Sequence, residues 1–286
     1  MNSSSIKNLL LILLFAVNVF LIIHLAFAGS SGASVSYEEA ENAVRALEKK
    51  EVYVEIEQIP LKQNTQSIIS ISCSVQDRIS AAEKFMGKIL AEYNLPNGIT
   101  YQSDNSYITF FDSGKFEYGL IEDRDTEAAD QNGQIHISSV TGDTRKKVKK
   151  AFSKLVSHSE NKKMFSLSEI GQSENNDTVT VYADLMIDGL KADNGLIIFK
   201  FRGNKLIYVS GKYVFDTFDK FYTKEYIDAT SALFLIEKRA NVEKMQMTYY
   251  PVMTDTDSYF FVPSWHITTS SGETFTFDAV SGYERK

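Results

Sequence analysis

The chain has 286 residues, of which 43% are hydrophobic and 23% charged, which is typical of a folded globular protein. Its net charge of −7 argues against general nucleic-acid binding. The single cysteine, Cys73, excludes an intrachain disulfide, so the fold must hold by packing alone.

The first predicted element is a membrane-spanning helix at residues 9–28. This segment contains no charged residue and approaches the roughly 20 apolar residues that cross a hydrocarbon core. Lys7 precedes it, and no Lys or Arg follows until Arg45. The positive-inside rule therefore predicts a cytoplasmic tail at residues 1–8 and an extracytoplasmic body. An extracytoplasmic domain without disulfides fits a Gram-positive surface better than a eukaryotic secreted protein.

A cleaved signal peptide is the alternative interpretation of this segment. Ala26-Phe27-Ala28 before Gly29 fits the small-x-small pattern of a signal peptidase site. The apolar stretch exceeds the roughly 7 to 15 residues of a typical signal-peptide core, so we favour a retained anchor. Asn18 lies deep in the segment, where its amide can hydrogen-bond to a neighbouring transmembrane helix.

The small, polar residues 29–36 predict a flexible linker, and residues 37–163 predict a first α+β lobe. Ser36 is placed to cap a helix that begins at Tyr37, and Asp77 to cap a second helix that carries apolar residues as far as Leu90. Turn residues and apolar alternation predict a strand that begins at Val52 and ends at Pro60, and further strands at 67–75, near Ile99, and at 107–111, 116–121 and 135–137.

Residues 164–286 repeat this order of elements and predict a second lobe. Thr223 is placed to cap a helix, and three strands follow it. Earlier strands are predicted at 178–187, 196–201 and 206–215, with turns at Asn194-Gly195 and Gly203-Asn204. We therefore expect an α+β fold: a single N-terminal transmembrane helix followed by a two-lobed extracytoplasmic domain of antiparallel sheets, each packed with helices.

The final strands show the clearest alternation. From Tyr259 to Ile267 the odd positions share one face, which predicts a core position for Trp265. Asp278 can bind backbone amides of the following turn, where Gly282 can adopt a positive φ.

Short motifs at both ends of the chain carry a family resemblance. Asn18-Val19-Phe20-Leu21, Tyr249-Tyr250-Pro251, Val262 to Ile267, Gly272 and Asp278 to Gly282 together resemble the YycI family, whose C-terminal end is similar to PepSY-type domains. The resemblance implies a membrane-anchored accessory protein that acts with the related YycH. Its partner would be the WalK (YycG) sensor histidine kinase of a cell-wall two-component system, contacted partly through the anchor at Asn18, Phe20 and Leu21.

The enzyme motifs that we tested are incomplete. Ser103-Asp104-Asn105 and the S-x-x-K pattern of Ser159 to Lys162 occur in the reverse of the β-lactamase order, and no K-T-G is present. We expect no catalytic residue and no cofactor.

A metal site is not predicted either. The acidic run of Asp123, Asp125, Glu127 and Asp130 has Ala128 and Gln134 where a calcium loop needs Gly and Glu. The four His residues, including His136, lack paired spacing.

A basic amphipathic helix is predicted between Arg145 and Lys163. This stretch contains eight Lys or Arg residues and one Glu, with an apolar stripe from Val148 to Val156. The basic side is either a solvated face or a surface that contacts anionic lipid, wall polymer or an acidic partner. Candidate contact residues are Arg145, Lys146, Lys149 and Lys150.

Two functions follow from these observations. The first is a non-enzymatic regulator that associates with a sensor histidine kinase and modulates its activity. The alternative is an extracytoplasmic binding module for a wall peptide or lipid.

Overall fold

The computed structural model describes residues 35–62, 66–72, 74–123, 138–156, 164–175, 177–212, 217–222, 226–255 and 258–285. None of the helices within these ranges has the length and apolar character needed to cross a membrane. The predicted anchor at residues 9–28 lies outside them. The predicted α+β class is confirmed, with four α-helices among the described residues.

The chain divides into two compact units, neither of which is one continuous stretch. Unit 1 comprises Met1–Ser67, Tyr222–Gln246 and Trp265–Lys286, and unit 2 comprises Ile68–Phe221 and Met247–Ser264. Strands β12 (Ala240–Asp255) and β13 (Ser258–Thr269) therefore contribute several residues to each unit, and the unit boundaries also fall within β2 (Ser67–Ser72) and β11 (Thr217–Tyr222).

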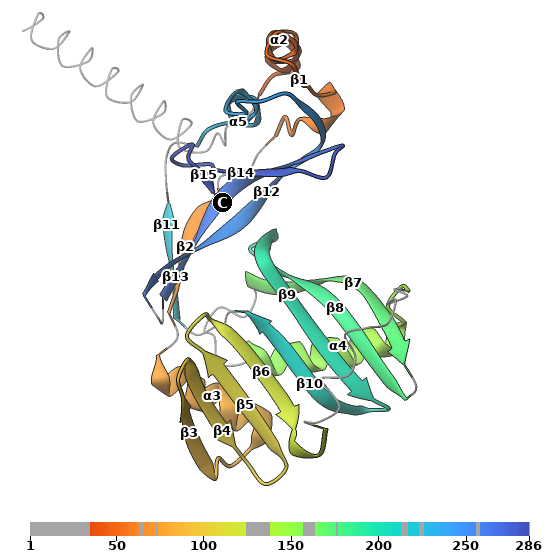
Figure 1. Ribbon diagram of the computed structural model, residues 1–286, viewed down its shortest axis with the longest axis vertical. Helices are drawn as coiled ribbons and strands as arrows, with labels where there is room; N and C mark the ends of the chain where they lie inside the picture. Colours follow the sequence, from red (N-terminus) through yellow and green to blue (C-terminus); the bar gives the residue numbers. More distant parts are fainter. Residues whose placement is uncertain are drawn as a thin grey trace, which may run out of the picture. The chain divides into compact units, whose positions relative to one another are not determined.

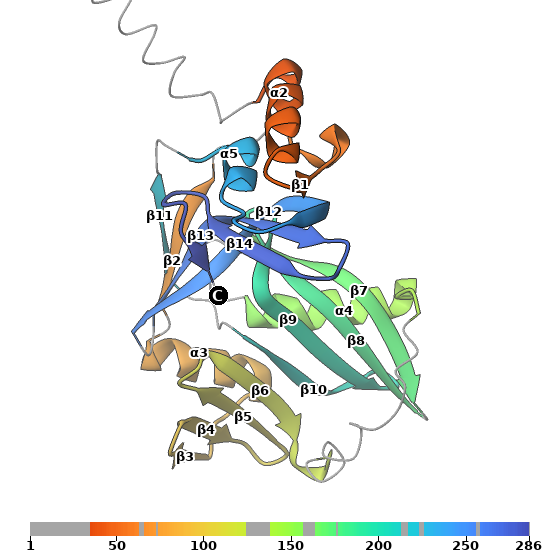
Figure 2. The same cartoon turned by 45° about the horizontal axis from the view of Figure 1, so that its top comes forward.

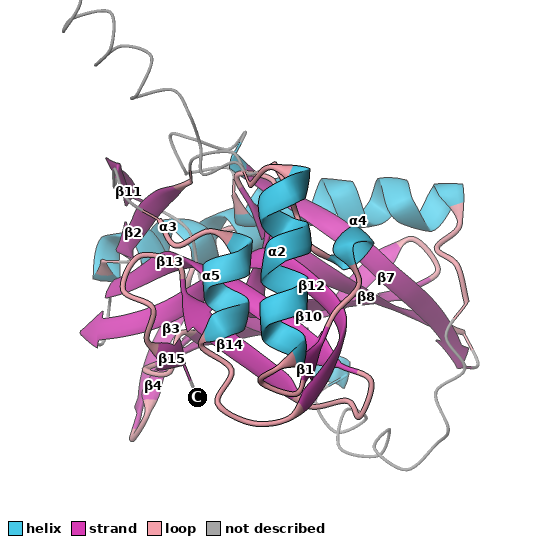
Figure 3. Cartoon of the chain, turned by 90° about the horizontal axis from the view of Figure 1, so that it is seen from above, coloured by secondary structure: helices cyan, strands magenta, loops and turns pink. Residues whose placement is uncertain are grey.

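Unit 1 is built on helices α2 (Tyr37–Glu48) and α5 (Ala229–Phe234), which lie side by side (Figure 3). Strand β1 (Val52–Tyr53) pairs in parallel with β12. The remaining elements are the 3₁₀-helix η1 (Ile56–Gln58) and the strands β14 (Thr274–Asp278) and β15 (Glu284–Arg285). Strand β14 pairs with both β13 and β15.

The cap of α2 was predicted from the sequence, whereas the cap of α5 was not. The Ser36 hydroxyl accepts a bond from the Glu39 amide, and the Glu39 carboxylate accepts the Ser36 N–H at 2.8 Å. This capping box confirms the predicted start of α2. In α5 the cap is Asp228, which accepts the Ser231 N–H at 2.7 Å. The predicted cap, Thr223, lies outside the described residues.

The C-terminal turn of unit 1 is confirmed. Trp265 is 1% exposed, and its indole N–H donates to the Ile227 carbonyl at 2.9 Å. The Asp278 carboxylate accepts the amides of Val280 and Ser281 at 2.8 and 3.1 Å, and Gly282 has a φ of +73°.

Unit 2 contains a mixed sheet against which helices α3 (Val75–Met86) and α4 (Gly142–Leu155) pack (Figure 1). The strand order is β11-β2-β13-β12-β9-β10-β6-β5-β4-β3. In addition, β8 pairs with β9, and β7 pairs with β8. The bounds are β2 (Ser67–Ser72), β3 (Ala91–Leu95), β4 (Gly98–Gln102), β5 (Ser106–Phe111), β6 (Lys115–Leu120), η2 (Ile121–Asp123), β7 (Phe165–Asn175), β8 (Thr178–Ile187), β9 (Leu190–Arg202), β10 (Lys205–Lys212) and β11 (Thr217–Tyr222).

Successive hairpins make up most of unit 2, and β3 to β6 lie side by side in chain order (Figure 2). The predicted all-antiparallel pairing is nevertheless wrong, because β12 pairs in parallel with β9 at Tyr249 and Ala192. The long connection between these strands permits that direction, which a short hairpin forbids.

Two local assignments are also corrected. Ser74 rather than Asp77 caps α3, with Asp77 as its capping-box partner, and Gly87 at φ +82° ends the helix before Leu90. The hairpin between β8 and β9 turns at Asp188-Gly189, whereas Asn194 and Gly195 lie within β9. There the register shifts, so this Asn-Gly pair forms a bulge rather than a turn.

Candidate functional site: the basic face of helix α4

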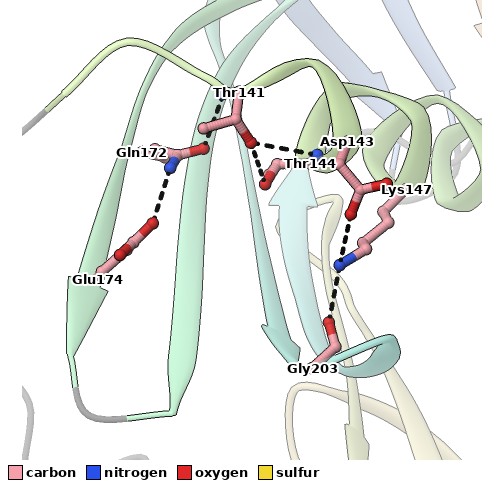
Figure 4. Close-up of polar contacts among 7 residues, drawn as sticks. All are labelled: Thr141, Asp143, Thr144, Lys147, Gln172, Glu174 and Gly203. Carbon is pink, nitrogen blue, oxygen red and sulfur yellow. Dashed lines mark hydrogen bonds and ion pairs between the residues drawn. The ribbon is translucent and has the colours of Figure 1, made fainter.

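Helix α4 begins where the sequence offers a polar cap. The Thr141 hydroxyl accepts the Thr144 N–H, and Asp143 lies in the first turn, where its charge complements the helix dipole (Figure 4). The Asp143 carboxylate also pairs with Lys147 at 3.1 Å. Local residues thus determine where the basic helix starts.

A buried glutamine on the neighbouring strand holds this start in place. Gln172 of β7 is 2% exposed, and its Oε1 accepts the Thr141 N–H at 3.1 Å. Its Nε2 donates to Glu174 at 3.0 Å, and its backbone pairs with Ser138. Figure 4 shows Gln172 pointing at the N-terminus of the helix. The cap residue therefore has a fixed position relative to β7.

The inner side of α4 belongs to the core of unit 2. Val148, Ala151, Phe152 and Leu155 are all buried in the hydrophobic cluster of this unit. This confirms the predicted apolar stripe and fixes which side of the helix faces solvent.

Two basic residues at the edges of this stripe make structural contacts. Arg145 Nε lies 2.5 Å from Glu169 Oε2 on β7. Lys147 donates to the Gly203 carbonyl in the β9–β10 turn at 3.0 Å. These contacts tie α4 to both neighbouring hairpins, so Arg145 is engaged within the protein.

The other three predicted basic residues point outward. Lys146, Lys149 and Lys150 are exposed, and no ion pair is found for them among the described residues. At about 100° per residue they span an arc of about 100° on the helix. We call these three lysines the basic face of α4. A group of three cations on a helix that packs against the core can bind an anion by charge.

The predicted contact residues in the anchor, Asn18, Phe20 and Leu21, lie outside the described residues. The same holds for Lys162 and Lys163, at the end of the predicted basic stretch. The helix itself ends at Leu155.

The described residues of the tested enzyme motifs, and the described histidine, make hydrogen bonds within turns and between strands. Ser103 bonds Ser106 through their hydroxyls at 2.8 Å, which closes the β4–β5 turn around Asp104 and Asn105. His266 bonds Thr276 at 3.2 Å. His136, Ser159 and Lys162 lie outside the described residues.

The acidic run contributes one described residue. Asp123 lies 2.8 Å from Arg202, and this hydrogen bond raises the pKa of Arg202. Within the part of the chain that the structure describes, no cluster of three or more His, Cys, Asp or Glu residues is arranged to hold a metal ion. Asp125, Glu127 and Asp130 lie outside that part.

Glu169 and Gln172, which position the helix, were not predicted. Both belong to β7, a strand that the sequence analysis did not identify. Small and polar residues occupy most of Phe165–Asn175, and such a composition does not indicate a strand.

Comparisons with known proteins do not identify a family for this chain. No family model matches the chain, and no curated protein matches it significantly. A solved structure of an uncharacterized protein from Eubacterium rectale ATCC 33656 is similar at 10% identity, over 78% of this chain and 85% of that chain, with a TM-score of 0.49.

Proposed function

We propose that this protein is a membrane-anchored, non-enzymatic regulator that associates with a sensor histidine kinase of a cell-wall two-component system. The observation that carries the proposal is the uncharged segment from Leu9 to Ala28, which precedes a folded α+β body. The resemblance of the chain's two ends to the YycI family supports the kinase as partner, with a YycH-like protein as a second one.

The anchor is the proposed point of signalling. Asn18 is an amide within hydrocarbon, where a neighbouring helix can supply its hydrogen-bond partner for about 0.6 to 2 kcal/mol. Asn18, Phe20 and Leu21 would then contact the transmembrane helices of the kinase, while the body lies outside the cell.

The test of association is purification of the tagged full chain from native membranes in mild detergent after crosslinking, followed by mass spectrometry. A co-purifying histidine kinase supports the proposal. Its absence, with the anchor protein recovered intact, contradicts it.

The test of the anchor uses a reporter of kinase output. Asn18→Leu should alter output at unchanged membrane content, Asn18→Gln should retain it, and Leu14→Ile serves as the matched control within the segment. Equal output from all three variants would show a passive tether. A reporter fused after Lys286 tests the orientation, since an extracytoplasmic fusion is expected.

A further inference from the structure

The basic face of α4 is unfavourable for the helix itself. Like charges three or four positions apart, as in Lys146 with Lys149 and with Lys150, destabilise an isolated helix. The one acidic residue of α4, Asp143, pairs with Lys147. Pairing within the helix therefore does not offset the charge of these three lysines, whereas an external anion would.

The kind of cation indicates the kind of anion. Arginine forms paired hydrogen bonds to carboxylates, whereas lysine acts as a point charge and is a common phosphate ligand. The one arginine of α4, Arg145, is engaged by Glu169. The outward cations are all lysines, which favours phosphate groups over an acidic protein surface.

The surroundings argue against insertion into a bilayer. An interfacial helix buries an apolar face among the lipids, but the apolar side of α4 is already in the core of unit 2. Ser153, the next residue on the outward face, is polar and exposed. Lys146 and Lys150 follow one another at about 6 Å along the helix axis, a row that suits a linear chain of charges.

We propose that the basic face of α4 binds a linear phosphodiester polymer of the cell wall. The inference rests on the extracytoplasmic position in the proposed function, and it adds a second binding activity to it. The lysines neutralise successive phosphates of the polymer, and the rigid docking of α4 holds them in place.

The test measures binding of fluorescent poly(glycerol phosphate) to the full chain in non-ionic detergent, by fluorescence anisotropy at several salt concentrations. The triple variant Lys146→Gln, Lys149→Gln, Lys150→Gln should bind roughly 100-fold more weakly at low salt, about fivefold for each lysine. The slope of log affinity against log salt should fall by about 2, since each phosphate contact contributes about 0.7.

The matched control removes the same charge elsewhere. Lys49, Lys62 and Lys244 are exposed residues of unit 1, and their triple substitution by Gln should leave binding and slope close to those of the unmodified chain. Thermal unfolding of both variants checks the fold, and the α4 variant should be at least as stable as the unmodified chain.

Equal losses in the two variants, or no loss in the α4 variant, would overturn the proposal. Tighter binding of polyglutamate would instead assign an acidic protein as partner, and binding of phosphatidylglycerol vesicles without binding of the polymer would assign lipid. None of these assays involves a kinase. Their failure is therefore distinct from failure of kinase association.

Discussion

Gln172 Oε1 accepts the backbone N–H of Thr141 at 3.1 Å, although 31 positions separate the two residues in the chain. This one bond joins a buried strand residue to the cap of the basic helix. The position of the basic face therefore depends on a residue that carries no charge.

Substitution Gln172→Leu should destabilise the protein by about 0.5 to 1.5 kcal/mol, because the amide of the exposed Thr141 would lose its protein acceptor. Urea unfolding of the full chain in detergent measures the effect. Gln76→Ala, an exposed position in α3, is the control and should change stability little. An unchanged midpoint for Gln172→Leu would mean that the bond does not hold the helix.

Substitution Gly142→Ala should stabilise the protein by about 0.4 to 1 kcal/mol, because alanine restricts the unfolded chain. A Cβ at this first residue of α4 meets no atom within 4 Å. Gly203 has similar space but a φ of +57°, so Gly203→Ala should destabilise. Thermal unfolding shows whether each variant is more or less stable than the unmodified chain. A loss of stability in Gly142→Ala would contradict the free space found around a Cβ at this position.

Substitution Gly114→Ala should destabilise far more than Gly189→Ala. Both residues have positive φ, but a Cβ on Gly114 would lie 2.1 Å from the Tyr259 hydroxyl, whereas one on Gly189 meets nothing within 4 Å. Strain of about 1 to 2 kcal/mol is common to both, and overpacking adds about 1 to 3 kcal/mol at Gly114. Equal unfolding midpoints in urea would refute the predicted contact with Tyr259.

Asp278 should make unit 1 sensitive to acid. Burial raises the pKa of Asp278, but hydrogen bonds from Arg285 and from the Ser281 and Val280 amides outweigh burial, so the pKa lies below its ordinary value of 3.8. A carboxyl group whose pKa is lower in the folded protein than in the unfolded chain stabilises the fold at any pH above the unfolded-state pKa. This contribution is lost as the pH falls through the folded-state pKa. Stability should therefore decline below about pH 4.

The variant Asp278→Asn isolates this contribution. It should be less stable than the unmodified chain at neutral pH, and the difference should shrink at low pH. Fluorescence of Trp265, the single tryptophan, follows unfolding of unit 1. Glu243→Gln, exposed in the same unit, is the control for charge, and a constant difference between pH 7 and pH 3 would reject the role of Asp278.

Signals within a few residues predicted local structure well. Ser36 with Glu39, the turn at Gly203-Asn204 and the turn at Asp278 follow from hydrogen bonds or dihedral angles of neighbouring residues. The inward side of α4 followed from periodicity alone. Asn194-Gly195 shows the limit of such local prediction. Its preference for a positive φ is compatible both with a hairpin turn and with a bulge, and the structure has a bulge.

Contacts between distant segments were not predictable. The parallel pairing of β9 with β12 and the bonds of Gln172 and Glu169 to α4 depend on the tertiary arrangement. The polar strand β7 carried no apolar alternation strong enough to identify it. The candidate lysines were found from charge, but which of the basic residues are engaged within the protein was evident only from the fold.

The discontinuous composition of unit 1 sets an order for its biogenesis. The hairpins from β3 to β6 join neighbouring segments and can form as soon as they emerge. Helix α2 and strand β1 must wait for β12 and for Trp265–Lys286, which complete the same unit. A nascent chain therefore exposes the apolar side of α2 throughout most of its synthesis, and that interval is when the protein is most exposed to aggregation and proteolysis.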